Sequence, residues 1–249
     1  MNEQKQNQII AQINNDFPLL SLKERLSFIG AEFSAPIFTT SLGIEDQAIS
    51  WAIANSAKSI KIATLQTGRL FSESLELIEK TKNHFNIDIA QYQPDAKQLQ
   101  DYIEQYSLNG FYDSKQARLA CCYVRKIAPL KRALKGADAW ITGLRGEQSN
   151  NRSAILFAQF DNEHDLVKLN PLADISLDEL KQIIADNKIP INPLHEKNYP
   201  SIGCEPCTRA IKLGENERAG RWWWENDQKK ECGLHFSANE QQTISEQQS

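Results

Sequence analysis

Two hydrophobic patterns alternate along most of the chain. Short apolar runs such as "PIFTTSLG" (36–43) and "SIKIATLQTG" (59–68) end in turns that contain glycine, which is typical of buried strands. Longer amphipathic segments such as "LFSESLELIEKTKNHF" (70–85) follow them and predict helices. Before the first strand, residues 3–30 have a loosely amphipathic pattern, which predicts one N-terminal helix.

The same patterns continue to about residue 190 and predict an α/β protein. Strands alternating with helices of this length form a parallel sheet with helices on both faces. A capping box, Ser176 with Glu179, marks the start of the last predicted helix. In order, the predicted elements are a strand at 36–43, a helix at 44–57, a strand at 59–68, a helix at 70–85, a strand at 88–93, a helix at 96–106, strands at 137–145 and 164–172, and a helix at 176–189.

Three of the predicted strands end in polar turns, and ligands of such sheets bind beyond the carboxyl ends of the strands. Ser41 and Gly43 stand before a helix, where backbone N–H groups attract phosphate, although an ordinary strand–helix turn explains this stretch equally well. Arginines at the other two turns favour an anion site, because arginine binds phosphate and sulfate oxygens with two donors. These arginines are Arg69, Arg145 and Arg152.

Charge and composition narrow the classes of function. The 249 residues are 41% hydrophobic and 24% charged, with a net charge of −4, so nothing suggests bulk attraction to nucleic acid. The start of the chain lacks a secretory signal and no apolar run is long enough for a membrane span, so we expect a cytoplasmic protein. Residues 116–152 nevertheless carry eight Lys or Arg and only two acids, which favours an anionic small molecule.

Five cysteines in a cytoplasmic chain indicate metal ligands or redox chemistry before structural disulfides. The pair Cys204 and Cys207 forms a CxxC, which suits zinc, an iron–sulfur cluster or a dithiol. Cys121 and Cys122 are adjacent, and neighbours on a helix point about 100° apart, so both hardly reach one small ion. We therefore rank a 4Fe–4S cluster first, structural zinc second and unliganded cysteines third.

Taken together, these stretches resemble the assimilatory adenylyl-sulfate (APS) and phosphoadenylyl-sulfate (PAPS) reductases. The resemblance rests on "SLGIEDQAI", "TGRLFSESLELI", "CCYVRKIAPLKRAL", "WITGLRGEQSNNR", "NYPSIGCEPCTRAIKLGENERAGRWWWE" and "KECGLH", and it spans roughly residues 37–236. It implies a fold like that of the N-type ATP pyrophosphatases, the adenine-nucleotide alpha-hydrolase-like fold. It also implies reduction of a nucleotide sulfate to sulfite, within sulfate assimilation.

The resemblance assigns roles to particular residues. Cys232 of "ECGLH" maps to the nucleophile, and Cys121, Cys122, Cys204 and Cys207 map to the ligands of the 4Fe–4S cluster. Members with all four ligands resemble APS reductases, which favours APS as the substrate. The candidate substrate-binding residues are Ser41, Gly43, Thr67, Gly68, Arg69, Lys126, Arg145, Arg152, Arg209, Arg218, Arg221 and His235.

The implied chemistry needs a partner protein. Cys232 attacks the sulfur of APS and AMP departs, which leaves an S-sulfocysteine that a second thiol, from thioredoxin or glutaredoxin, resolves into sulfite. We divide the chain into a nucleotide-binding and iron–sulfur domain, 1–215, and a C-terminal segment, 216–249, that carries Cys232 and a polar tail. A homo-oligomer is expected, without nucleic-acid or membrane partners.

Two positions depart from the family pattern. Gln66 stands where an Asp is usual before TGR, and Gly146 stands where a second basic residue often follows Arg145. Three other functions stay open: a PAPS reductase on the same fold, a zinc-stabilised nucleotide-binding redox sensor, and a tRNA-sulfurating relative. The last lacks support, because the chain has no SGGxDS-type loop and no basic net charge.

Overall fold

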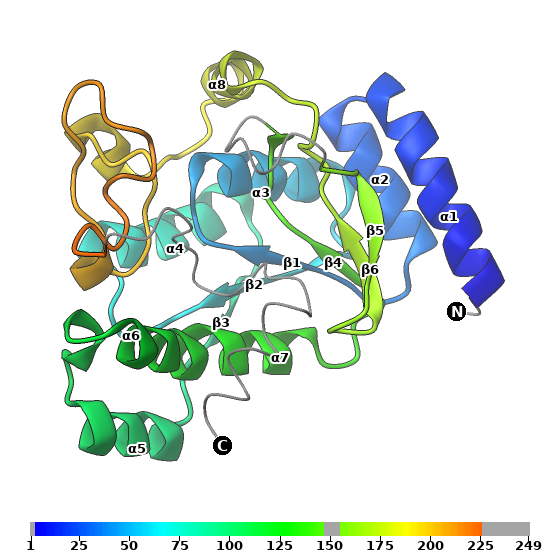
Figure 1. Ribbon diagram of the computed structural model, residues 1–249. Coiled ribbons are helices and arrows are strands. Elements are labelled where there is room, and N and C mark those ends of the chain that lie inside the picture. Colours follow the sequence, from blue (N-terminus) through cyan, green and yellow to red (C-terminus); the bar gives the residue numbers. More distant parts are fainter. Residues whose placement is uncertain (1–2, 147–154, 226–249) are drawn as a thin grey trace. The chain divides into compact units, whose positions relative to one another are not determined.

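The computed structural model in Figure 1 describes residues 3–146 and 155–225, and these fall into two compact units. Unit 1 consists of Met1–Thr64, Ser72–Ala90 and Leu134–Pro193; unit 2 consists of Leu65–Phe71, Gln91–Ala133 and Leu194–Ser249. Each unit is thus assembled from three stretches of chain. The predicted boundary between residues 215 and 216 falls inside unit 2.

Six strands among the described residues form one mostly parallel sheet, in the order β3-β2-β1-β4-β6-β5 (Figure 1). Strand β1 is parallel to both β2 and β4, and β4 is parallel to β6. This confirms the predicted α/β fold with a parallel core. The strands are β1 (Pro36–Thr40), β2 (Lys61–Leu65), β3 (Ala90–Tyr92), β4 (Ala139–Ile141), β5 (Ala158–Asp161) and β6 (Leu166–Leu169).

Strand β5 was not predicted, and it makes the sheet mixed. It pairs antiparallel with β6 through a tight turn, in which the Asp161 carboxylate accepts the N–H of Glu163 at 3.0 Å. Only Ala158 of its four residues is buried, so the strand carries no apolar run for a sequence pattern to reveal. An antiparallel edge strand on an otherwise parallel sheet is a common arrangement.

The prediction of one helix over residues 3–30 was also wrong in detail. Helix α1 (Glu3–Asp16) ends before a 3₁₀ turn that contains Pro18, and α2 (Leu22–Glu32) starts anew. Proline has no N–H to continue the helix. A capping box of Ser21 and Glu24 then opens α2, with the Ser21 N–H donating to Glu24 at 2.8 Å.

Helices α3, α4, α5 and α8 lie where the patterns place them, whereas α6 and α7 were not among the predicted elements. Helix α5 has the predicted bounds, and Ser176 and Glu179 form the expected capping box of α8. Within unit 1, the hydrophobic core joins Phe38, Ile49 and Ile141 with residues of α1, α2 and α8. The helices are α3 (Ile44–Ser56), α4 (Ser72–Phe85), α5 (Ala96–Tyr106), α6 (Lys115–Cys122), α7 (Ala128–Leu134) and α8 (Leu177–Asp186).

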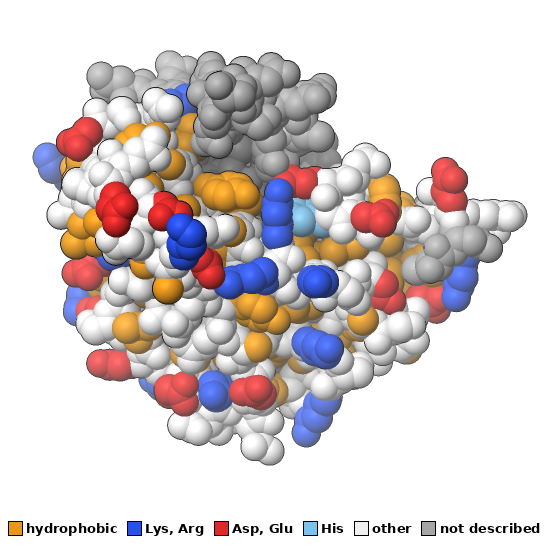
Figure 2. All heavy atoms as spheres, turned by 90° about the horizontal axis from the view of Figure 1, so that it is seen from below, with side chains coloured by type: hydrophobic (Ala, Val, Ile, Leu, Met, Phe, Trp, Pro, Cys, Tyr) orange, Lys and Arg blue, Asp and Glu red, His pale blue; other side chains and the backbone are white. Residues whose placement is uncertain are grey.

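None of the helices described is both long enough and apolar enough to cross a lipid bilayer. The face seen in Figure 2 carries Lys and Arg as well as Asp and Glu side chains, interspersed with apolar ones. Lys131, Arg132 and Lys135, from the basic stretch noted above, are exposed at α7 and just after it. The cytoplasmic location and the homo-oligomer both stay predictions.

Candidate active site

In unit 1, the order in which the strands are added to the sheet reverses between β1 and β4. Strand β2 lies on one side of β1 and β4 on the other, so the carboxyl ends of β1 and β4 flank a topological switch point. Ligands of open α/β sheets bind at such points. Ser41 and Gly43 follow β1, and Gly143 and Arg145 follow β4. The predicted turns after these two strands thus belong to one edge of the sheet.

A buried carboxyl group holds the turn after β1. Asp46, in the first turn of α3, accepts hydrogen bonds from the Ser41 N–H at 2.5 Å and from the Ser41 hydroxyl at 2.7 Å. Leu42, between Ser41 and Gly43, has φ +64°, a conformation that L-residues other than Asn and Asp seldom adopt. Burial raises the pKa of Asp46 to about 7, although the bonds from Ser41 act in the opposite direction.

Arg145 is buried and contacts an acid rather than open solvent. Its Nε lies 3.2 Å from Glu45 of α3, and its Nη1 donates to the carbonyl of Ile175 at 3.4 Å. These contacts fix the guanidinium beside the turn after β1. Arg152, the other candidate of this loop, lies outside the described residues.

Gly143 makes the close approach of the two turns possible. A Cβ at this position would lie 2.1 Å from Asp46 Oδ1. We expect Gly143→Ala to lower the free energy of unfolding by about 2 kcal/mol, because the buried carboxyl group would have to move. Thermal unfolding would show this as a Tm lower by roughly 5 °C.

Gly43→Ala is the matched control for stability. A Cβ there would make ordinary contacts, the nearest being Ser41 Oγ at 3.5 Å. We expect its Tm to stay within about 1 °C of that of the parent protein. Equal losses in both variants would contradict a specific clash with Asp46.

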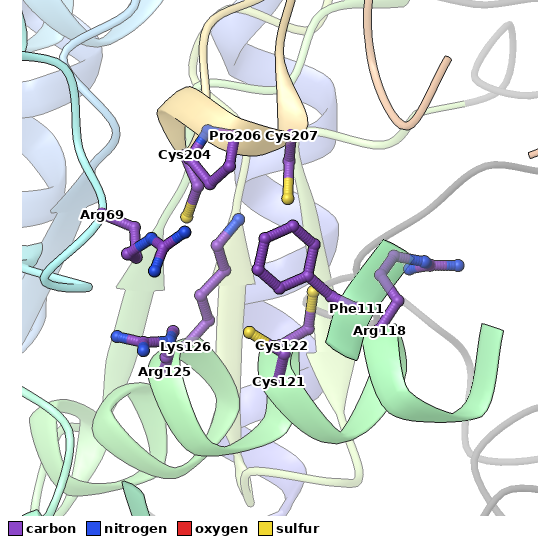
Figure 3. A pocket seen from close by; sticks show the side chains of 10 residues that line it. All are labelled: Arg69, Phe111, Arg118, Cys121, Cys122, Arg125, Lys126, Cys204, Pro206 and Cys207. Atoms are coloured by element: carbon purple, nitrogen blue, oxygen red, sulfur yellow. The ribbon is translucent and has the colours of Figure 1, made fainter. Parts of the chain in front are cut away.

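Unit 2 holds a pocket in which four cysteines come together, here called the thiol pocket (Figure 3). All four thiols are buried. Cys121 and Cys122 come from the end of α6, and Cys204 and Cys207 from a short 3₁₀ turn opposite, with Lys126 between the two segments (Figure 3). The pocket is lined by Arg69, Phe111, Arg118, Cys121, Cys122, Arg125, Lys126, Cys204, Pro206 and Cys207.

Local sequence explains how each segment presents its thiols. Ser114 caps α6 by accepting the Ala117 N–H at 3.1 Å, and a π-helical stretch, Tyr123–Ile127, follows Cys122. In the other segment Pro206 favours the 3₁₀ turn, where the Cys207 N–H donates to the Cys204 carbonyl at 3.0 Å. Short π-helical stretches occur often at functional sites.

The thiols differ in acidity. Burial raises the pKa of Cys207 to about 12, and it also raises the pKa of Cys121. Burial acts in the same direction on Cys204, but the charge of Lys126 and the Thr67 hydroxyl at 3.3 Å outweigh it and lower the pKa. A cation bound here would favour the thiolate form of all of them.

Cations and the "TGR" turn surround the thiols. Arg125 donates to the Thr67 carbonyl at 2.7 Å, and Arg69 donates to Asn109 at 2.7 Å while its guanidinium lies over the ring of Phe111. Gln66, which replaces the usual Asp, accepts the Gly68 N–H at 2.7 Å. An amide oxygen therefore still holds this turn, although the negative charge that an Asp would bring is absent.

The other predicted arginines of unit 2 occupy different surroundings. Arg221 is buried, and a Cβ at Gly203 would come within 2.4 Å of its guanidinium. Arg209 forms a bidentate pair with Glu215 at 2.8 and 2.9 Å, and Arg218 is half-buried. The Arg221 guanidinium is thus packed closely against Gly203, whereas Arg209 is paired with an acid. Cys232 and His235 lie outside the described residues.

Unused hydrogen-bonding capacity remains near the thiols. Within residues 3–146 and 155–225, the Nε atoms of Arg125 and Arg221 are buried and have no hydrogen-bond partner. In the same part of the chain, no three His, Cys, Asp or Glu side chains are grouped closely enough to hold a single metal ion.

Several residues of both sites were not predicted from the sequence. Arg118, Arg125 and Phe111 line the thiol pocket, and Asp46 and Gly143 fix the turns of unit 1. "CCYVRK" offered a partial signal for Arg125, since it lies beside the two cysteines in sequence. No pattern marked Asp46, because it and Glu45 are acidic residues in the first turn of a helix, where acids are common.

Residues 35–210 match the phosphoadenosine phosphosulfate reductase domain, so the chain belongs to that family. The adenosine 5'-phosphosulfate reductase of Agrobacterium fabrum is 54% identical over 222 residues, which cover 89% of this chain and 85% of the relative. The enzyme of the same name from Allochromatium vinosum is 51% identical over 212 residues, 85% of this chain and 83% of the relative.

Solved structures agree with the fold. The PAPS reductase of Candida auris superimposes with a TM-score of 0.70 at 22% identity, over 81% of this chain and 96% of that one. The FMN adenylyltransferase of Candida glabrata gives a TM-score of 0.50 at 12% identity, over 96% and 90% of the two chains. The adenine-nucleotide alpha-hydrolase-like fold that the resemblance implied is thereby confirmed.

Proposed function

We propose that this protein reduces adenosine 5'-phosphosulfate to sulfite and AMP in sulfate assimilation, with thiols as the electron source. The observation that carries the proposal is the similarity, at 51–54% identity over most of both chains, to enzymes named for this substrate. All four cysteines of the thiol pocket and Cys232 are present.

The reaction oxidises the two thiols of a partner protein and regenerates Cys232. The Cys232 thiolate attacks the sulfur of APS, an S–S bond forms, the S–O bond to AMP breaks, and AMP leaves as a stabilised phosphate anion. A thiol of thioredoxin or glutaredoxin then attacks Cys232 Sγ and releases sulfite. The second thiol of that partner resolves the mixed disulfide, so the partner leaves as a disulfide and two electrons have reduced the sulfonyl group.

Cys121, Cys122, Cys204 and Cys207 would hold a 4Fe–4S cluster. The donor set fits: four buried thiols from two segments line one pocket, and a cluster offers each its own iron. Arg69, Arg125 and Lys126 would offset the negative charge of four thiolates. When bound, the cluster would supply a fixed charge and would hold the two cysteine segments rigidly together, because the electrons come from the thiols.

Anion binding falls to the cations of the two units. The buried, unpartnered Nε atoms of Arg125 and Arg221 support an anion in unit 2, because an unused buried donor is costly. In unit 1 the N-terminus of α3, which begins after Gly43, suits a phosphate, while Ser41 donates both its hydrogen bonds to Asp46 and so shapes the turn beside it. Thr67, Gly68, Arg69, Arg145, Arg152, Arg209, Arg218 and His235 complete the proposed substrate-binding set.

The decisive experiment is a sulfite-release assay on anaerobically purified protein with reduced thioredoxin and either APS or PAPS. We expect rapid turnover of APS and about four irons per chain. PAPS is the second candidate, because the family and the Candida auris structure are both named for it. A preference for PAPS would change the substrate. No sulfite from either, with zinc in place of iron, would favour a sensor.

Lys126→Ala should weaken turnover while leaving the iron in place. Lys126 lines the thiol pocket and lowers the pKa of Cys204, so its ammonium group can act on the cluster thiolates and on a substrate sulfate at once. Losing one charge-assisted contact costs about 1.5–3 kcal/mol, so we expect kcat/KM for APS to fall roughly 10- to 100-fold. Lys135→Ala, an exposed lysine just after α7, is the control. Unchanged turnover of Lys126→Ala with full iron would reject this role.

A further inference from the structure

The last described residues before Cys232 are fixed to the helix that carries two of the pocket cysteines. Arg118 of α6 pairs with Glu225 in a bidentate manner, Nε to Oε1 at 2.6 Å and Nη2 to Oε2 at 3.1 Å. The Arg118 side chain is 1% exposed and the Glu225 side chain 10%. Shielding from solvent and two parallel bonds make this a strong type of ion pair.

A turn of unusual conformation connects Glu225 to the CxxC segment. Trp222 is 1% exposed with φ +43°, its N–H donates to the Cys207 carbonyl at 3.1 Å, and its carbonyl accepts the Glu225 N–H at 2.9 Å. The guanidinium groups of Arg118 and Arg221 lie over its ring, 4.8 and 4.7 Å from the centroid. A left-handed tryptophan persists only where its surroundings hold it firmly.

Together these contacts define an anchor, made of Arg118, Trp222 and Glu225. Both segments that carry the pocket cysteines contribute to it: α6 through Arg118 and the CxxC turn through the Cys207 carbonyl. Cys232 follows Glu225 by only seven residues, which span at most about 25 Å when fully extended. The anchor therefore sets the point from which the nucleophile must reach its target.

We propose that the Arg118–Glu225 ion pair is a positioning device for Cys232. The inference rests on the proposed function, and it assigns the pair no contact with APS. Reaction rates of tethered groups depend steeply on where the tether holds them, and displacements of about 1 Å can lower a rate 10²-fold. By this mechanism, correct assembly of the thiol pocket also aims the catalytic thiol.

Glu225→Gln tests the proposal, since it keeps the shape of the side chain and removes its charge. The measured quantities are the single-turnover rate of Cys232 S-sulfonation, followed by mass spectrometry after mixing with APS without reductant, the Kd of APS, and the iron content. We expect S-sulfonation about tenfold slower, with the Kd and the iron content unchanged. Glu217→Gln, an exposed acid in the same segment, should behave like the parent protein.

A second variant guards against misfolding. Arg118→Lys keeps the buried positive charge but loses the two-point geometry, so it should slow S-sulfonation in the same direction. A merely structural role would lower the iron content and the nucleotide affinity together with the rate, and that result would overturn the proposal. An unchanged rate of S-sulfonation in both variants would overturn it as well. A parent protein that forms no adduct on Cys232 would instead overturn the proposed function.

Discussion

Replacing Cys232 by serine should abolish sulfite release while leaving APS binding intact. A hydroxyl group is far less acidic than a thiol, so it supplies almost no anion at neutral pH, and it cannot form a mixed disulfide with the partner thiol, the step in which sulfite leaves. We expect turnover to fall by roughly a thousandfold or more. The measurement is sulfite release with reduced thioredoxin, alongside the Kd of APS by calorimetry.

Ser237→Ala, five residues further on, is a matched control in the same segment, and it should keep full turnover. Mass spectrometry adds a direct test, because the parent protein should gain a sulfonate that maps to Cys232 and the serine variant should gain none. Sulfite release by the serine variant at the parent rate would show that another group is the nucleophile.

The second large effect concerns iron. Cys204→Ala removes one thiolate from the four in the thiol pocket, and a cluster iron would lose its protein ligand. We expect iron to fall from about four per chain to less than one. Iron and acid-labile sulfide analysis on anaerobically purified protein measures this, with the visible absorption of the cluster as a second readout.

Cys232→Ser is the control for that experiment, since it also removes a cysteine but should keep all the iron. The two variants thus separate the roles assigned to the five cysteines. If Cys204→Ala retained its full iron content, or if the parent protein contained zinc, the cluster assignment would have to be given up, while the fold and the family would stand.

Much of the fold could be predicted because its elements have strong local patterns. Strands β1 and β2 are apolar runs closed by glycine turns, and α5 has a clear amphipathic period within its predicted bounds. The errors arose where local signals were weak or competed. Strand β5 buries only Ala158 of its four residues, and Pro18 interrupts a hydrophobic pattern that otherwise runs on.

The sites were predictable to the extent that their residues carry unusual chemistry. Cysteines are rare enough for Cys121 and Cys204 to attract notice, and the structure brings their segments into one pocket. The residues that hold these groups in place were missed, because an ordinary arginine such as Arg118 finds its ion-pair partner in Glu225, 107 positions later. Contacts of that range leave no periodic trace in the chain.

The π-helical stretch Tyr123–Ile127 bears on how the chain tolerates insertions and deletions. A π-turn accommodates one residue more than an α-turn, and each residue of an α-helix advances the direction of its side chains by about 100°. Deleting one residue here would restore a continuous α-helix, and it would change the direction in which Arg125 and Lys126 point relative to Cys121 and Cys122. The length of this short stretch therefore bears on where these two cations lie, whichever residues fill it.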